Sequence, residues 1–196
     1  MASGQTQEDI DKGFLVDLIE SNLSSSTRDV SITGFKGALS SAASLDVMTI
    51  ADADGVWLTL EDVVLDWNRS AVLRGQIDVE ELSAARIIIT RPPASEPSAP
   101  SPEAVGFSLP SLPVGIALGK LAIAEIVLGE AFLGEEISLS LTGNAALSGG
   151  EGNAMVTAKR LGNKAGIFSI DGSYSNESRI LALDLSGAED AAGIAA

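Results

Sequence analysis

The acidic sequence Asp52-Ala-Asp54-Gly55 is the part of the chain whose residue types and spacing come nearest to metal chemistry. Alternate carboxylates can converge on a hard cation such as Ca²⁺, and the glycine allows a sharp turn. An EF-hand loop also needs a third acidic position and a glutamate beyond the glycine, and both are missing. A hairpin turn with solvated aspartates is therefore favoured over a calcium site.

The carboxylates Asp62 and Asp66 have the residue type that glycoside hydrolysis uses. On one strand they share a face but lie about 13 Å apart at ~3.3 Å per residue, which is too far for that acid and base. We interpret both as solvent-facing charge. The chain also has one local concentration of basic residues, and the acidic residues interspersed among them favour ion pairing on strand faces. These residues are Arg69, Arg74, Arg86 and Arg91.

The composition excludes most common enzyme chemistry. The 196 residues include no histidine and no cysteine, which removes Ser-His-Asp and Cys-His catalysis, zinc and iron–sulfur ligation, and disulfides. The chain has no phosphate-binding glycine motif and no Ser-x-x-Lys sequence. Its net charge of −15 repels phosphate backbones. We expect a protein that is not an enzyme, has no cofactor or metal and binds no nucleic acid.

The apolar residues are mostly aliphatic. They make up 45% of the chain, only 4% of it is aromatic, and the mean hydropathy is +0.28. The most apolar stretch, residues 114–129, is interrupted by Lys120 and Glu125, so we expect no membrane span in this sequence. A large aliphatic surface must therefore be shielded from water in some way other than by a membrane-spanning segment.

The patterning predicts one helix followed by strands. Residues 7–23 carry an apolar stripe at helical spacing, and we expect this amphipathic helix to pack as a lid on the end of a sheet. Lying on a membrane is the alternative, but the polar face is acidic and would lack attraction to anionic lipid. From Asp29 onward the apolar period becomes two, which is typical of half-buried strands.

About a dozen short strands are predicted, joined as antiparallel hairpins, with turns at spots such as Glu80-Glu81 and a bulge near Glu125. All seven prolines fall between Pro92 and Pro113, where they favour a loop. The predicted regions are 1–27 (amphipathic helix), 28–91 (first β-rich half), 92–113 (Pro-rich loop), 114–187 (second β-rich half) and 188–196 (truncated C-terminal segment).

Two architectures fit this alternation. One is a closed β-sandwich whose inner faces bury each other, and the other is a curved sheet left open as an apolar trough. An open trough suits a lipid, because burying each acyl methylene contributes about 0.8 kcal/mol, or on the order of 10 kcal/mol for a chain of ~15. Such a groove needs an aliphatic lining and no catalytic residues.

Several short segments, taken in order, resemble the N-terminal periplasmic part of the TamB family, the inner-membrane subunit of the bacterial translocation and assembly module. In the first half these are Val30-Ser-Ile-Thr-Gly-Phe-Lys-Gly37, Asp52-Ala-Asp-Gly-Val-Trp-Leu58, Asp66-Trp67, Leu73-Arg-Gly-Gln-Ile-Asp-Val79 and Ile87-Ile-Ile-Thr-Arg-Pro92. In the second half they are Leu112-Pro-Val, Leu121-Ala-Ile-Ala-Glu-Ile-Val-Leu-Gly129, Gly134 and the region of Leu183. The resemblance covers nearly the whole chain beyond the first helix.

This resemblance implies an AsmA-like envelope protein of Gram-negative bacteria. Such a protein has an N-terminal inner-membrane anchor and a long periplasmic β-taco whose apolar interior conducts phospholipid between the inner and outer membranes. The family is also linked to β-barrel assembly through an outer-membrane partner. The present sequence lacks the anchor, so we expect a fragment of the groove, with an edge strand exposed at each cut.

The sequence therefore predicts a mainly β protein, an elongated curved antiparallel sheet with an open groove, that conducts phospholipid and contributes to outer-membrane biogenesis. The alternative is a scaffolding module that docks β-barrel substrates by strand addition. The residues predicted to line the groove are Val30, Ile32, Leu45, Val47, Leu58, Leu60, Val63, Leu65, Trp67, Leu73, Ile77, Val79, Ile87, Ile89, Ile137, Leu139, Leu141, Leu181, Leu183 and Leu185.

Overall fold

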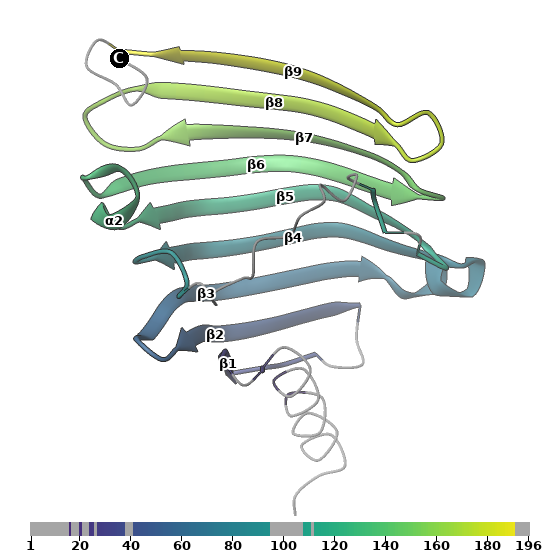
Figure 1. Ribbon diagram of the computed structural model, residues 1–196. Helices are drawn as coiled ribbons and strands as arrows, with labels where there is room; N and C mark the ends of the chain where they lie inside the picture. The colour runs from purple at the N-terminus through teal and green to yellow at the C-terminus, as the bar shows by residue number, and fades with distance from the viewer. Residues whose placement is uncertain are drawn as a thin grey trace, which may run out of the picture.

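The computed structural model describes residues 16, 20, 24–25, 27–37, 41–94, 108–110 and 112–190. Its centre is one curved nine-stranded sheet in which the strands follow one another in chain order (Figure 1). The strands are β1 (Asp29–Thr33), β2 (Ala42–Asp52), β3 (Gly55–Asn68), β4 (Gln76–Ile89), β5 (Gly115–Leu128), β6 (Ile137–Ser148), β7 (Glu151–Arg160), β8 (Gly166–Ser175) and β9 (Ile180–Glu189). Because β1 and β9 stand at opposite ends of this order, the sheet is not closed into a barrel. The predicted curved, open β fold is confirmed.

One strand pair departs from the antiparallel prediction. β4 and β5 are parallel, with Gln76 opposite Gly115 and Ile89 opposite Leu128, whereas every other neighbouring pair is antiparallel. A parallel pair needs a crossover of a dozen or more residues, and the proline-rich connection after β4 is long enough to supply it. The described part of that connection contains no strand residue. We call residues 90–114 the crossover.

The strands are fewer and longer than the sequence pattern predicts. β4 continues through Glu80 and Glu81, where we expected a turn. β3 continues through Asp62, whose φ is +51°, and β5 shifts register twice, the second time at the expected bulge near Glu125. Each irregularity shifts the alternation by one residue without ending the strand. Breaks in periodicity that resemble strand ends are therefore bulges.

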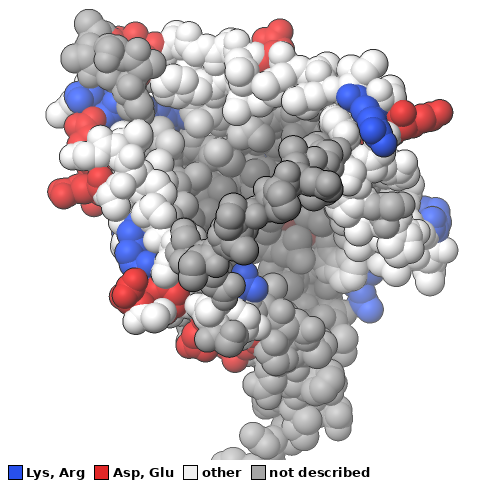
Figure 2. Space-filling model, in the orientation of Figure 1, with Lys and Arg blue, Asp and Glu red and all other residues white. Residues whose placement is uncertain are grey.

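The register assigns the strand residues to two faces, because residues directly opposite each other across a ladder point the same way. One such row runs from Leu60 through Ile87, Ile126 and Leu139, and we call its side of the sheet the groove face. The other side, which carries the row Glu61, Arg86 and Glu125, is the outer face. Figure 2 shows the groove face as a hollow with charged side chains around its rim.

Few side chains of the described part are fully buried. The buried hydrophobic residues are Val30, Ile32, Ala71, Ala84 and Ile137. None of the described polar or charged residues is buried when its backbone is counted together with its side chain. At the far edge Leu181, Leu183 and Leu185 are 62%, 54% and 64% exposed. The described residues form a single sheet that does not bury its apolar side against a second one, so the open trough fits and the closed sandwich does not.

The helical elements are short. The η1 turn (Arg69–Arg74) joins β3 to β4, capped by the Asn68 side chain at its start and by Gly75 with a φ of 70° at its end. The α2 turn (Glu130–Leu133) follows β5. The helix predicted over residues 7–23 lies outside the described residues, except for Val16 and Glu20, which are helical. Within the described ranges, no helix combines the length and apolarity needed to cross a membrane.

Candidate functional site

The groove face collects most of the predicted lining residues. We assigned the faces by following the register from β1 to β9. β4 and β5 pair without a shift from Gln76–Gly115 to Ile89–Leu128, and the β2–β3, β3–β4 and β5–β6 ladders each contain at least one shift. The predicted residues found on the groove face are Val30, Ile32, Leu45, Leu58, Leu60, Val63, Leu65, Trp67, Ile77, Val79, Ile87, Ile89, Ile137, Leu139, Leu141, Leu181, Leu183 and Leu185.

Val47 and Leu73 do not lie on the groove face, and the prediction for both is corrected. Val47 is opposite Glu61 on the outer face, because the chain changes phase beside Asp62. Leu73 lies in the η1 turn and is 91% exposed. Leu73 comes before the turn glycine Gly75, and β4 begins only after that glycine. Leu73 is therefore outside the strand.

The lining also includes residues that the prediction omitted. Most of them lie on β5, β7 and β8, and two lie on β2. The alternation of apolar and polar residues is visible in the sequence of these strands. In β5, however, two bulges divide this alternation into short segments. The added residues are Met48, Ile50, Ile116, Leu118, Leu121, Ile123, Ile126, Leu128, Val156, Phe168, Ile170 and Tyr174.

A hollow of about 400 Å³ lies on the groove face over the later strands. Small residues make room for it, since Ala154 and Gly172 are opposite each other on β7 and β8. The larger lining side chains are almost all apolar. They are Leu109, Leu147, Val156, Ile170, Tyr174 and Leu181.

The end of the crossover lies against this hollow. The Leu109 N–H donates to Asn176 Oδ1 at 2.8 Å, and Asn176 Nδ2 donates to the Leu109 carbonyl oxygen at 2.9 Å. The Leu109 side chain packs over Gly152, where a Cβ would meet Leu109 Cδ1 at 2.9 Å. The glycine therefore lets the crossover approach the floor of the groove.

The start of the crossover is held by the motif that resembles a calcium loop. Arg91 donates two hydrogen bonds to the Asp52 carboxylate, at 2.6 and 2.9 Å, and the Ala94 N–H adds a third at 2.8 Å. These bonds, led by the one from Arg91, hold the pKa of Asp52 well below its usual range. The turn prediction holds, but Asp52 is not solvated, since its side chain is only 5% exposed. Its oxygens accept hydrogen bonds from Arg91, from the Ala94 N–H and from the Asp54 N–H, the last at 2.9 Å.

A second ionic cluster lies at the ends of β7 and β9. Arg160, with a 6% exposed side chain, contacts Glu135 at 2.8 Å and Glu189 at 3.2 Å. Hydrogen bonding to Arg160, and then to Lys164, lowers the pKa of Glu135. Arg160 and Glu189 occupy groove-face positions of their strands, but both lie at strand ends and are paired. The middle of the described groove face thus stays uncharged.

Of the four arginines for which strand-face ion pairing was predicted, Arg86 makes such a pair, and it lies on the outer face. Arg69 and Arg74 lie in the η1 turn, and Arg91 pairs with Asp52 after the end of β4. Arg86 Nη2 lies 2.6 Å from Glu125 Oε2, and the Ser138 hydroxyl donates to the same carboxylate at 3.1 Å. The bond from Arg86, followed by that from Ser138, lowers the pKa of Glu125. The outer face carries charged groups and hydroxyls, and the groove face carries aliphatic groups. The sheet is therefore strongly amphipathic.

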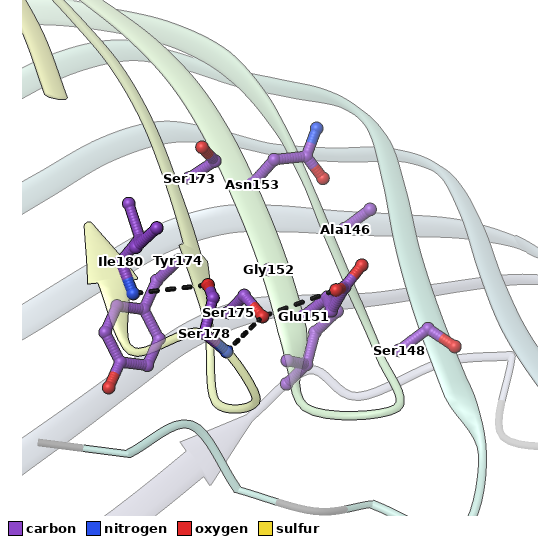
Figure 3. A pocket seen from close by; sticks show the side chains of 11 residues that line it. Ala146, Ser148, Glu151, Gly152, Asn153, Ser173, Tyr174, Ser175, Ser178 and Ile180 are labelled. Carbon is purple, nitrogen blue, oxygen red and sulfur yellow. Dashed lines mark hydrogen bonds between the residues drawn. The ribbon is translucent and has the colours of Figure 1, made fainter. Parts of the chain in front are cut away.

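A hydroxyl-rich pocket of about 510 Å³ lies where the β6–β7 and β8–β9 turns meet (Figure 3). Ser175 Oγ donates to Glu151 Oε1 at 3.4 Å, and the Ser178 N–H donates to Ser175 Oγ at 3.4 Å. The pocket shares Leu147, Gly152 and other lining residues with the apolar hollow. An apolar surface therefore adjoins a polar one at this end of the sheet.

The fold and the site define an open β-sheet trough with an apolar groove face. Comparison with protein-family models, with curated proteins and with solved structures gave no match.

Proposed function

We propose that this chain is a non-enzymatic segment of a lipid conduit whose groove face receives the acyl chains of phospholipids. The observation that carries the proposal is the continuous apolar groove face of a single open sheet. An acyl chain laid on it removes water from both surfaces, with a gain of about 0.8 kcal/mol for each methylene that becomes buried. The lipid headgroup would stay at the open side, where solvent and the hydroxyl-rich pocket can hydrate it.

The lining suits movement of lipid along the sheet. Apolar contact is non-directional and depends on area, so an acyl chain can shift along the groove without breaking specific bonds. The charged groups at groove-face positions, Asp52, Arg160 and Glu189, are paired at strand ends. They leave the central rows free of polar groups that would hold a lipid at one place.

The proposed setting is the periplasm of a Gram-negative bacterium, with the full-length protein tethered to the inner membrane and acting with an outer-membrane assembly partner. The resemblance to the TamB family supports this part of the proposal. The proposed role is phospholipid transfer between the two membranes, which contributes to outer-membrane biogenesis.

The first test places a charge on either side of β6. Leu139→Asp puts a carboxylate on the groove face, and Ser140→Asp puts the same group on the outer face one residue later. We expect purified wild type and Ser140→Asp to retain co-purified phospholipid in native mass spectrometry, and Leu139→Asp to lose it. Position 139 lies opposite Arg160, which is already paired with Glu135 and Glu189. A further carboxylate beside acyl chains is therefore unfavourable, whereas a solvated one on the outer face costs little.

Two controls make this test decisive. A photocrosslinking amino acid at position 139 should capture lipid, and the same probe at position 140 should not. Both aspartate variants should unfold at nearly the wild-type temperature, because Leu139 faces a trough. Absence of lipid from the wild type together with no crosslink from position 139 contradicts the proposal, as does unfolding of Leu139→Asp alone, which indicates a dry core.

A further inference from the structure

The η1 turn presents aliphatic side chains to solvent. Leu73, at 91%, is the most exposed large hydrophobic residue of the described part, and its neighbour Val72 is 48% exposed. Ala71, in the same turn, is fully buried. The apolar contact that holds η1 on the sheet therefore comes from Ala71, and the packing does not use the larger side chains at positions 72 and 73.

Hydrogen bonds fix this turn at both ends. Asn68 Oδ1 accepts from the Ser70 N–H at 3.1 Å and from the Ser70 hydroxyl at 2.7 Å. At the other end, the Gly75 carbonyl oxygen accepts from the Gly115 N–H at 3.2 Å, which ties the turn to the start of β5. The structure itself thus directs Leu73 into solvent.

The charge of the turn is opposite to that of the whole chain. Residues 68–77 include Arg69 and Arg74 and no acidic residue, whereas the chain has a net charge of −15. Both arginines are exposed. The nearest acidic residues in the sequence, Asp66 and Asp78, belong to β3 and β4 and lie on the sheet side of the turn. An anionic surface that meets the tip of η1 therefore meets arginine first.

The α2 turn gives an internal comparison. It exposes Leu133 at 51%, but residues 130–136 contain three glutamates and no basic residue. Because η1 precedes β4, α2 follows β5 and these two strands are parallel, the two turns lie at opposite ends of the sheet (Figure 1). Exposed aliphatic side chains are thus flanked by cations at one end and by glutamates at the other.

A membrane surface fits the η1 turn better than a protein partner does. Two protruding side chains cannot bury the roughly 1,000 Å² that a specific protein interface needs. The headgroup region of a bilayer, in contrast, accepts apolar side chains with cations beside them. The turn lies inside the strand order, between β3 and β4, so strands added beside β1 or β9 would not cover it.

We propose that the η1 turn is a contact site for an anionic phospholipid bilayer. Val72 and Leu73 enter the headgroup region, and Arg69 and Arg74 lie beside the phosphate groups. The acidic remainder of the chain is repelled by the same surface, so the contact is confined to this turn and is weak on its own. It goes beyond the proposed function, because η1 lies outside the groove face and its contact does not require lipid in the groove.

Flotation of the full chain with vesicles tests this contact. We expect wild type to float with vesicles of phosphatidylcholine and phosphatidylglycerol in equal parts, much less with phosphatidylcholine alone, and less when salt is added. Leu73→Asp should weaken binding to the anionic vesicles at least about tenfold, and Arg74→Gln about fivefold.

Two variants are matched to these. Leu133→Asp makes the same change in the α2 turn, and Lys159→Gln removes one positive charge at an exposed position of β7. Both should bind the anionic vesicles like wild type. All four variants should unfold at nearly the wild-type temperature, because the altered side chains are exposed.

A single label reports insertion directly. The chain has no cysteine, so Leu73→Cys and Leu133→Cys each provide one attachment point for an environment-sensitive dye. We expect a blue shift of the dye at position 73 with anionic vesicles and none at position 133. Adding Leu139→Asp, which is expected to remove lipid from the groove, should leave the shift at position 73 intact. The two proposals can therefore fail separately.

The proposal is overturned if wild type floats with neither kind of vesicle or equally with both. Equal binding of wild type and Leu73→Asp also overturns it, because another part of the chain would then hold the membrane. The same holds for equal blue shifts at positions 73 and 133.

Discussion

At the scale of single residues, the charged side chains support the fold and leave the groove uncharged. Asp52 and Arg91 join the β2–β3 turn to the start of the crossover, and Arg160 joins β7 to β9 through Glu189. The residue pattern at Asp52 suggested a turn, but its partner could not be predicted, because Arg91 is 39 residues away in sequence.

The Asp52–Arg91 pair predicts a pH-dependent stability. The pKa of Asp52 is lower in the folded protein than in the unfolded chain, so the unfolded state takes up more protons as the pH falls. This contribution is complete above the unfolded pKa of about 4 and is lost as the pH falls below it. In urea unfolding between pH 7 and pH 3, wild type should therefore exceed Asp52→Asn in stability at neutral pH, and the difference should shrink below about pH 4.

The matched control is Asp54→Asn, an exposed position two residues away in the same turn. This substitution leaves both Arg91–Asp52 hydrogen bonds in place, so the variant should keep the loss of stability below about pH 4 that these bonds predict. A constant difference between wild type and Asp52→Asn across the same pH range would show that the ion pair does not contribute.

At the scale of elements, bulged strands and a pinned crossover shape the groove. The alternation of apolar residues predicted the strands, because that signal is local and repeats every second residue. The parallel β4–β5 pair was missed, because pairing across a long connection depends on where the chain returns. Likewise, Val47 was assigned to the wrong face because its side is fixed by its partners Thr33 and Glu61 in the neighbouring strands, which the local alternation of β2 does not show.

The attachment of Leu109 predicts a gating effect of the crossover. Asn176→Ala removes both hydrogen bonds that hold the Leu109 backbone, so the Leu109 side chain should leave the hollow more often. We expect faster exchange of the Leu109 amide and increased binding of a fluorescent fatty acid. Asn163→Ala, an exposed change in the β7–β8 turn, is the control and should alter neither. Faster exchange with unchanged binding would show that Leu109 does not compete with acyl chains.

At the scale of the whole molecule, the sheet acts as one apolar surface whose residues contribute collectively. The strength of lipid binding should therefore follow the length of the acyl chain. Each added methylene should increase affinity by up to about fourfold while it still lies on the groove face. Competition between fatty acids of increasing length for the purified protein measures this slope. An affinity independent of chain length would indicate recognition of the headgroup and contradict the conduit proposal.

The amino-acid pattern was sufficient to show that the chain forms two-faced strands, because the side on which a residue points depends on neighbours only two positions away. It also showed that catalytic and metal-binding side chains are scarce. Whether the apolar side is covered was decided only by the tertiary structure, because closure depends on pairing between distant strands. The sheet stays open since β1 and β9 lie at opposite ends of a single strand order, and no described second sheet packs on the groove face.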